Sequence, residues 1–185
     1  MKLFTIAIVS LVISQAAASA QQPGDMTHCP MHNQHVQNTG AASEQPQTAS
    51  HFEAVDRRGD KAMGFDQDKT THHFILKMAG GIIRVETNGA ADDTSRSSIR
   101  AHLTHIPKAF SQGDFEIPMF VHDQTPPGVS VMKNKKNQIN YEYRELPAGG
   151  EIVITSSDRQ AIAAIHEFLK FQIQDHRTGD SLSVQ

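Results

Sequence analysis

The sequence contains no tryptophan and only one cysteine, Cys29, among its 185 residues. A single cysteine cannot close a disulfide within the chain, so its thiol stays free, bridges two chains or binds a metal ion. The fold must therefore be held together by its apolar core. The formal net charge is only −3. That value gives no reason to expect nucleic acid or an anionic membrane surface as a partner.

Several catalytic signatures are also missing from the sequence. It has no Gly-x-Ser-x-Gly turn, no phosphate-binding glycine loop and no dinucleotide fingerprint. It has no Cys-x-x-Cys-His for covalent haem, and neither His-Glu-x-x-His nor Cys-x-x-Cys for zinc. These absences favour a protein that is not an enzyme, and leave metal-assisted chemistry at histidines as the enzymatic alternative.

A long apolar run occurs only at the N-terminus. Lys2 precedes an apolar stretch from Leu3 to Ile13, and the small residues Ala-Ser-Ala stand at positions 18–20. This order is typical of a cleaved signal peptide, here residues 1–20, and the run is too short to span a membrane. We therefore expect an exported protein of the periplasm or extracellular space, without stable membrane insertion after cleavage.

The remaining chain predicts one domain with a tail at each end. Residues 21–50 are rich in Gln, Ser, Thr and Ala and have few large aliphatic side chains, which predicts a flexible tail. Residues 51–180 have the length and patterning of a single α+β domain, followed by a C-terminal tail at 181–185.

The domain is built from two similar halves. Residues 72–88 and 139–157 each alternate apolar and polar side chains around an Ala-Gly-Gly turn, which predicts two β-hairpins. An amphipathic helix follows each hairpin, the first starting near Asp92 and the second at Ser157 or Asp158. Their apolar stripes are Ile99, Leu103, Ile106 and Phe110, and Ile162, Ile165, Leu169 and Ile173. We therefore expect two ββα units that form one antiparallel sheet of about four strands, covered by two main helices. This similarity indicates an internal repeat, with chance likeness of two generic units as the alternative.

Three segments carry further local expectations. The first helix contains Pro107, which should kink or interrupt it. Residues 51–65 contain Arg-Gly-Asp at 58–60, which favours an entry strand or hairpin. The proline-rich stretch 114–138 predicts a functional loop or crossover, with a short strand at Phe120 and Val121 and a helical turn at 129–135.

Metal-capable side chains crowd the N-terminal tail. Thioether, imidazole and thiolate groups occur together at Met26, His28, Cys29, Met31, His32 and His35. Thiolate and thioether ligands favour soft ions such as Cu(I), and imidazole binds many transition metals. We therefore take His28, Cys29, Met31, His32 and His35 as the first candidate metal site. The alternative is a polar tail in which the cysteine is incidental.

The stretch Cys-Pro-Met-His at 29–32 resembles the short heavy-metal-binding motif Thr-Cys-Pro-Met-His-Pro, found near the N-termini of copper and silver efflux components. His28 stands where that motif has Thr, and Asn33 stands where it has its second proline. The resemblance implies binding of Cu(I), Ag(I) or a similar ion by Cys29, Met31 and His32. The domain resembles small exported bacterial proteins of unassigned function, which implies no mechanism.

A second candidate site lies in the domain. His73, His102, His105, His122 and Asp123 come from neighbouring predicted elements and form a possible site for zinc or copper. The alternative is that they are hydrogen-bonded residues at the edge of the core. His166 and His176 are interpreted as structural, and the dipole of the last helix should favour a protonated His176.

These observations lead to three hypotheses. The first is an exported protein that binds copper, or a similar soft ion, through its tail and serves another exported or membrane metal-handling protein. The second is a small metal-dependent enzyme that uses the domain histidines. The third is an interaction module that binds no metal and has a flexible tether.

Overall fold

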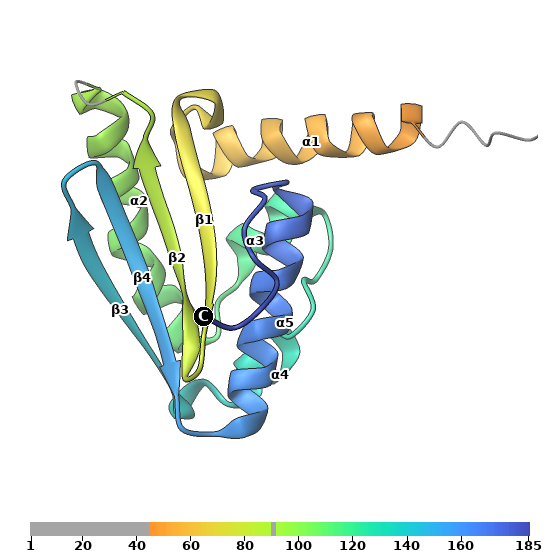
Figure 1. Cartoon of the computed structure of the whole chain (residues 1–185), viewed down its shortest axis with the longest axis vertical. Coiled ribbons are helices and arrows are strands. Elements are labelled where there is room, and N and C mark those ends of the chain that lie inside the picture. The colour runs from red at the N-terminus through yellow and green to blue at the C-terminus, as the bar shows by residue number, and fades with distance from the viewer. Residues whose placement is uncertain (1–44, 90–91) are drawn as a thin grey trace, which may run out of the picture. The chain divides into compact units, whose positions relative to one another are not determined.

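The structure is a computed structural model that describes residues 45–89 and 92–185. The order of its elements in this part of the chain follows the two predicted ββα units (Figure 1). The strands are β1 (Thr70–Lys77), β2 (Gly80–Thr87), β3 (Ile139–Leu146) and β4 (Gly149–Ser156). The helices are α1 (Gln45–Met63), α2 (Asp93–Gln112), α3 (Glu116–His122), α4 (Val129–Asn134) and α5 (Arg159–Asp175), with short 3-10 turns at Gln67–Lys69 and Lys136–Gln138.

The four strands form one antiparallel sheet in the order β1-β2-β4-β3. Each of the two helices that cover the sheet packs on the hairpin of the other unit. Helix α2 follows β2 but lies mainly against β3 and β4, whereas α5 follows β4 and lies mainly against β1 and β2 (Figure 1). Each helix therefore buries its apolar face on the hairpin of the other unit. The predicted α+β class, with four strands and two main covering helices, is confirmed.

The two Ala-Gly-Gly turns occupy equivalent places in the sheet. The carbonyl of Ala79 accepts a hydrogen bond from Ser156 N at 2.8 Å, and the carbonyl of Ala148 accepts one from Thr87 N at 2.9 Å. Each hairpin turn is thus bonded to the end of the central strand from the other unit. This reciprocal arrangement fixes the register between β2 and β4, with Gly80 opposite Thr155 and Gly149 opposite Glu86.

The core lies between one face of the sheet and the helices α2 and α5. The predicted stripe of α2 is buried as expected, and in α5 Ile165, Leu169 and Ile173 are buried while Ile162 is only partly so. Gly81 allows the closest approach of helix and sheet, because a Cβ there would lie 2.2 Å from Leu169 Cδ1.

Both long sheet-covering helices start where the sequence predicts. Asp92 caps α2 by accepting a hydrogen bond from Ser95 N, and Asp158 caps α5 by accepting one from Ala161 N. Of the two effects predicted for Pro107, a kink or an interruption, the interruption is wrong, because α2 runs through it to Gln112. Proline removes one backbone donor, and burial of Ile106 and Phe110 on either side of it supports the continuous helix.

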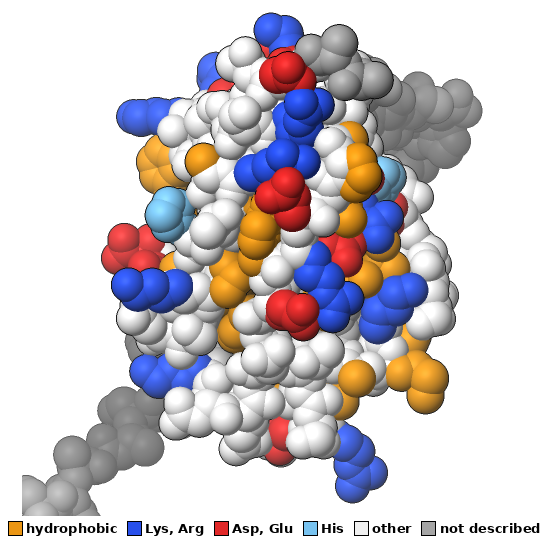
Figure 2. Space-filling model, turned by 90° about the vertical axis from the view of Figure 1, so that its left-hand side faces the viewer, with side chains coloured by type: hydrophobic (Ala, Val, Ile, Leu, Met, Phe, Trp, Pro, Cys, Tyr) orange, Lys and Arg blue, Asp and Glu red, His pale blue; other side chains and the backbone are white. Residues whose placement is uncertain are grey.

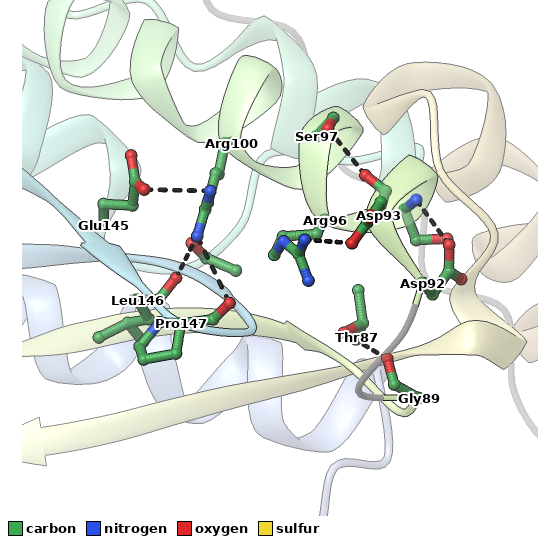
Figure 3. A network of polar contacts seen from close by, with 12 residues as sticks. Thr87, Gly89, Asp92, Asp93, Arg96, Ser97, Arg100, Glu145, Leu146 and Pro147 are labelled. Carbon is green, nitrogen blue, oxygen red and sulfur yellow. Dashed lines mark hydrogen bonds and ion pairs between the residues drawn. The ribbon is translucent and has the colours of Figure 1, made fainter.

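Arg100 ties α2 to the turn between β3 and β4 (Figure 3). Its guanidinium donates to the carbonyls of Leu146 at 2.7 Å and Gly149 at 3.2 Å, and pairs with Glu145 at 3.0 Å. One turn earlier, Arg96 pairs with Asp93 of its own helix (Figure 3). The two arginines therefore differ in role: in the contacts among the described residues, only Arg100 of the two bonds carbonyls of another element.

Two local predictions are wrong. Residues 51–63 form part of helix α1 instead of a strand or hairpin. The Arg-Gly-Asp sequence is not a turn, because Gly59 is buried within α1 and a Cβ there would lie 2.2 Å from Gln67 Nε2. Phe120 and Val121 lie in helix α3, which packs beside α1. The predicted helical turn at 129–135 is confirmed as α4.

The face of the sheet that points away from α2 and α5 carries both charged and apolar side chains. Arg84 pairs with Glu151 at 2.8 Å, next to the half-buried Ile82 and Val153. Figure 2 shows such apolar side chains lying between charged ones on the side of the molecule that β3 and β4 occupy. The C-terminal segment lies along the edge of β1, where Gln185 N donates to Leu76 O at 3.0 Å.

Candidate functional site

Histidines from four elements gather at one end of the core. They line a cavity of about 70 Å³ between the sheet, α2, α3 and α5. Its polar lining residues are His72 on β1, His102 on α2, His122 on α3, and Gln172 and His176 at the end of α5. Apolar side chains form the rest of the wall, among them Phe74, Ile83, Val85, Leu103, Ile106 and Phe168.

The imidazoles pack as aromatic rings. The rings of His72 and His176 are parallel within 4°, with centroids 5.7 Å apart. Phe65 stacks near His72 at 5.8 Å, and Phe74 near His176 at 5.7 Å. His102 meets the edge of Phe65 at 5.9 Å. The cluster is thus a mixed stack of phenylalanine and histidine rings that continues the apolar core.

This setting disfavours charge on three of the histidines. Burial, followed by the charge of neighbouring imidazoles, lowers the pKa of His72 to about 4 and the pKa of His102 to about 4. Burial, followed by His72 and His122, lowers the pKa of His176 to about 3. All three rings are neutral at pH 7. The prediction that the helix dipole favours a protonated His176 is wrong, because desolvation outweighs the dipole.

His122 is held by hydrogen bonds on both ring nitrogens. Its Nδ1 lies 2.5 Å from Asp175 Oδ2, and its Nε2 lies 2.9 Å from Gln172 Oε1. The second oxygen of Asp175 bonds His51 Nε2 of α1 at 2.7 Å. Burial raises the pKa of Asp175, but the hydrogen bonds from His51 and His122 outweigh it and hold that pKa below its usual value. A carboxylate between two imidazoles therefore joins α1, α3 and α5.

Two buried polar atoms of the cavity lining have no hydrogen-bond partner among the described residues: His72 Nε2 and Gln172 Nε2. An unsatisfied buried donor or acceptor costs about 1–3 kcal/mol. Native interiors leave few such groups unpaired, and those that remain commonly contact water or a ligand. The unpaired atoms mark this cavity as the candidate functional site of the domain.

The structure separates the predicted domain site. His73 lies on the opposite face of the sheet from His102, since neighbouring residues of a strand point to opposite sides. His73 Nδ1 is 2.9 Å from Asp180 Oδ1. His105 is exposed on α2, and exposed Asp123 ends α3 in a left-handed conformation. Only His102 and His122, of these five residues, line the cavity.

No group of three or more His, Cys, Asp or Glu side chains in residues 45–89 and 92–185 is arranged to hold a metal ion. The first candidate site, His28, Cys29, Met31, His32 and His35, lies outside the described residues. In the described part of the chain, no helix combines the length and apolar character that crossing a membrane requires.

Sequence reasoning missed His72, Gln172 and His176. His72 had a usable signal, because it shares the alternation of Phe74 and Leu76 and so faces the core. His176 had none, because it lies beyond the last turn of α5 and its burial depends on β1 and α3 packing against it.

Comparison with known proteins does not assign this site. No family model, no curated protein and no solved structure matches the chain. A function for this chain therefore has to be inferred from the chemistry of its own residues.

Proposed function

We propose that this protein is exported and binds a soft metal ion, copper in the first place, through His28, Cys29, Met31, His32 and His35. The observation that carries the proposal is the spacing of Cys29, Met31 and His32, which supplies a thiolate, a thioether and an imidazole within four consecutive positions. Sulfur ligands of this kind select Cu(I) over harder ions. Zinc is the less suitable alternative because it has no preference for thioether.

The chemistry of the domain supports this placement of the metal. Within its described residues, both nitrogens of His122 and one nitrogen of His73 are engaged by acidic or amide groups. His166 contributes its Nε2 to the carbonyls of Lys77 and Gly80, at 2.9 and 3.0 Å. A metal ion that bound these rings would have to replace their hydrogen bonds. Binding by the N-terminal Cys-Pro-Met-His motif would leave these hydrogen bonds of the domain in place.

The proposed partner is another exported or membrane protein that delivers or accepts the ion. Cu(I) transfer between proteins proceeds readily between sulfur-rich ligand sets because both sites present soft donors. The domain would then serve as the folded carrier of the binding segment. An export signal at residues 1–20 places both functions outside the cytoplasm.

The test is a Cu(I) competition titration of residues 21–185, the chain without its predicted signal peptide. It is done under reducing conditions, with a chromogenic chelator as competitor. Cys29→Ser and Met31→Leu should each weaken Cu(I) binding at least about tenfold, equivalent to about 1.4 kcal/mol. Met78→Leu is the matched control, because Met78 is 84 % exposed in the turn between β1 and β2 and offers a free thioether elsewhere. Equal affinity in the wild type, Cys29→Ser and Met31→Leu would reject the proposal.

A further inference from the structure

We propose that the histidine-lined cavity is a binding site for a small uncharged molecule with an apolar body and one hydrogen-bonding group. The proposal concerns the domain alone and does not depend on metal binding by the N-terminal segment. Nothing in the sequence motifs assigns a ligand to this cavity. Its walls, its free polar atoms and its size each restrict what it can hold.

The walls favour an uncharged ligand. Among the described residues that line the cavity, no lysine, arginine, aspartate or glutamate occurs. The carboxylate of Asp175, which contacts His122 of the lining, is already engaged by His51 and His122. A charged ligand would lose its hydration without gaining an ion pair, which is costly in an apolar setting. The lining therefore selects against anions and cations.

The free polar atoms define a hydrogen-bonding end. Gln172 is 4 % exposed, and while its Oε1 contacts His122 Nε2, its Nε2 has no partner. The amide therefore leaves one hydrogen-bonding atom unused in a residue that lines the cavity, where water or a ligand can contact it. His72 Nε2, on β1, is the second unpaired atom of the lining. A ligand that contacts both would relieve two unsatisfied groups at once.

The size sets an upper limit on the ligand. An apolar cavity of about 150 Å³ accommodates benzene. The present cavity, at about 70 Å³, is smaller and suits a molecule below the size of benzene. Its polar lining also distinguishes it from a dry apolar void, because dry voids lack free donors and acceptors.

A route of access adjoins the cavity. A wider hollow of about 300 Å³ is lined by Gln67, Thr71 and Thr178, and also by His72 and His176. These two stacked rings therefore stand between the hollow and the cavity. A ligand that enters from the hollow has to pass the His72–His176 stack before it reaches Gln172.

The experiment is an NMR titration of the metal-free mature chain at pH 7 with pyrazole, a small neutral ring that carries both a donor and an acceptor nitrogen. Saturable shifts should appear for the Gln172 side-chain amide and for the rings of His72 and His176. Thiophene, a ring of similar size without an N–H, should bind at least about tenfold more weakly. Absence of saturable shifts at the highest pyrazole concentration that leaves the protein folded would overturn the proposal, since water alone then fills the cavity.

Pairs of matched variants test whether pyrazole binds in this cavity. Gln172→Met should reduce pyrazole affinity at least about tenfold, whereas Gln174→Met, two residues away and exposed on the same helix, should leave it unchanged. His72→Phe and exposed His105→Phe form a second pair with the same expectation. Equal affinity in Gln172→Met, His72→Phe and the wild type would also overturn the proposal. The wild-type titration stands on its own if a variant fails to fold.

Discussion

The rings of His72 and His176 lie parallel, 5.7 Å apart, although one residue belongs to the first strand and the other follows the last helix. This contact joins β1 to the residue that follows α5. Because both rings are kept neutral by burial, the contact is a packing interaction at pH 7 that turns into charge repulsion in acid.

The first prediction concerns pH. An unfolded chain protonates its histidines below about pH 6.5, whereas folded His72 and His102 take up protons only near pH 4 and His176 near pH 3. The free energy of unfolding should therefore fall as the pH drops from 6.5 toward 4. Each ring should contribute on the order of 1 kcal/mol per pH unit in this window.

Urea denaturation at several pH values between 7 and 4 measures this slope. His176→Phe should keep the aromatic packing. It should also make the free energy of unfolding depend less steeply on pH, because one histidine no longer takes up a proton on unfolding. Gln174→Met, an exposed position that carries no titratable group, should leave the slope unchanged. An identical slope in His176→Phe and the wild type would show that His176 does not resist protonation in the folded protein.

The second prediction concerns Arg100. Arg100→Met should lower the free energy of unfolding by about 1.5–3 kcal/mol, because hydrogen bonds from a charged donor to the carbonyls of Leu146 and Gly149 are lost. Arg96→Met, which removes a pair with exposed Asp93 on the same helix, should cost less than about 1 kcal/mol. Chemical denaturation of both variants compares the two, and equal losses would contradict the role assigned to Arg100.

The third prediction concerns Gly81. Gly81→Ala should destabilise the protein by about 1–3 kcal/mol, since the added methyl would overlap Leu169 and the carbonyl of Ile75. Gly89→Ala is the control, because nothing lies within 4 Å of a Cβ at that position. Thermal unfolding of the two variants provides the measurement. A Gly81→Ala protein as stable as Gly89→Ala would mean that α5 and β2 are less closely packed.

The fourth prediction concerns the attachment of α1. Asp175→Asn weakens the hydrogen bonds to both His51 and His122, so it should speed amide hydrogen exchange in α1 and α3. His51→Ala removes one of the two and should affect α1 alone. Exchange measured by mass spectrometry separates these patterns. Unchanged exchange of α1 in both variants would show that other contacts hold this helix.

The sequence predicted those elements whose formation depends on neighbouring residues in the chain. The hairpins follow from alternation around Ala-Gly-Gly, and the starts of α2 and α5 follow from the capping residues Asp92 and Asp158. Helix α1 was missed because Gly59 is typical of turns, while in the fold it lets the helix approach Gln67. That approach depends on tertiary packing, which a local pattern does not contain.

The candidate site was predictable only in part. Alternation along β1 separates His72 from His73, and it indicates that His72 shares the face of Phe74. It does not indicate that His176, distant in sequence, will stack on His72. The partners of Gln172 were equally hidden, because a polar residue in an amphipathic helix ordinarily faces water.

X-ray absorption spectroscopy of the Cu(I)-loaded mature chain tests the proposed function most directly, because it identifies the atoms that coordinate the metal. We expect sulfur in the first coordination shell, lost in part in Met31→Leu and further in Cys29→Ser, with no change in Met78→Leu. A first shell made only of nitrogen and oxygen, identical in the wild type and Cys29→Ser, would contradict it and move metal binding to the histidines of the domain.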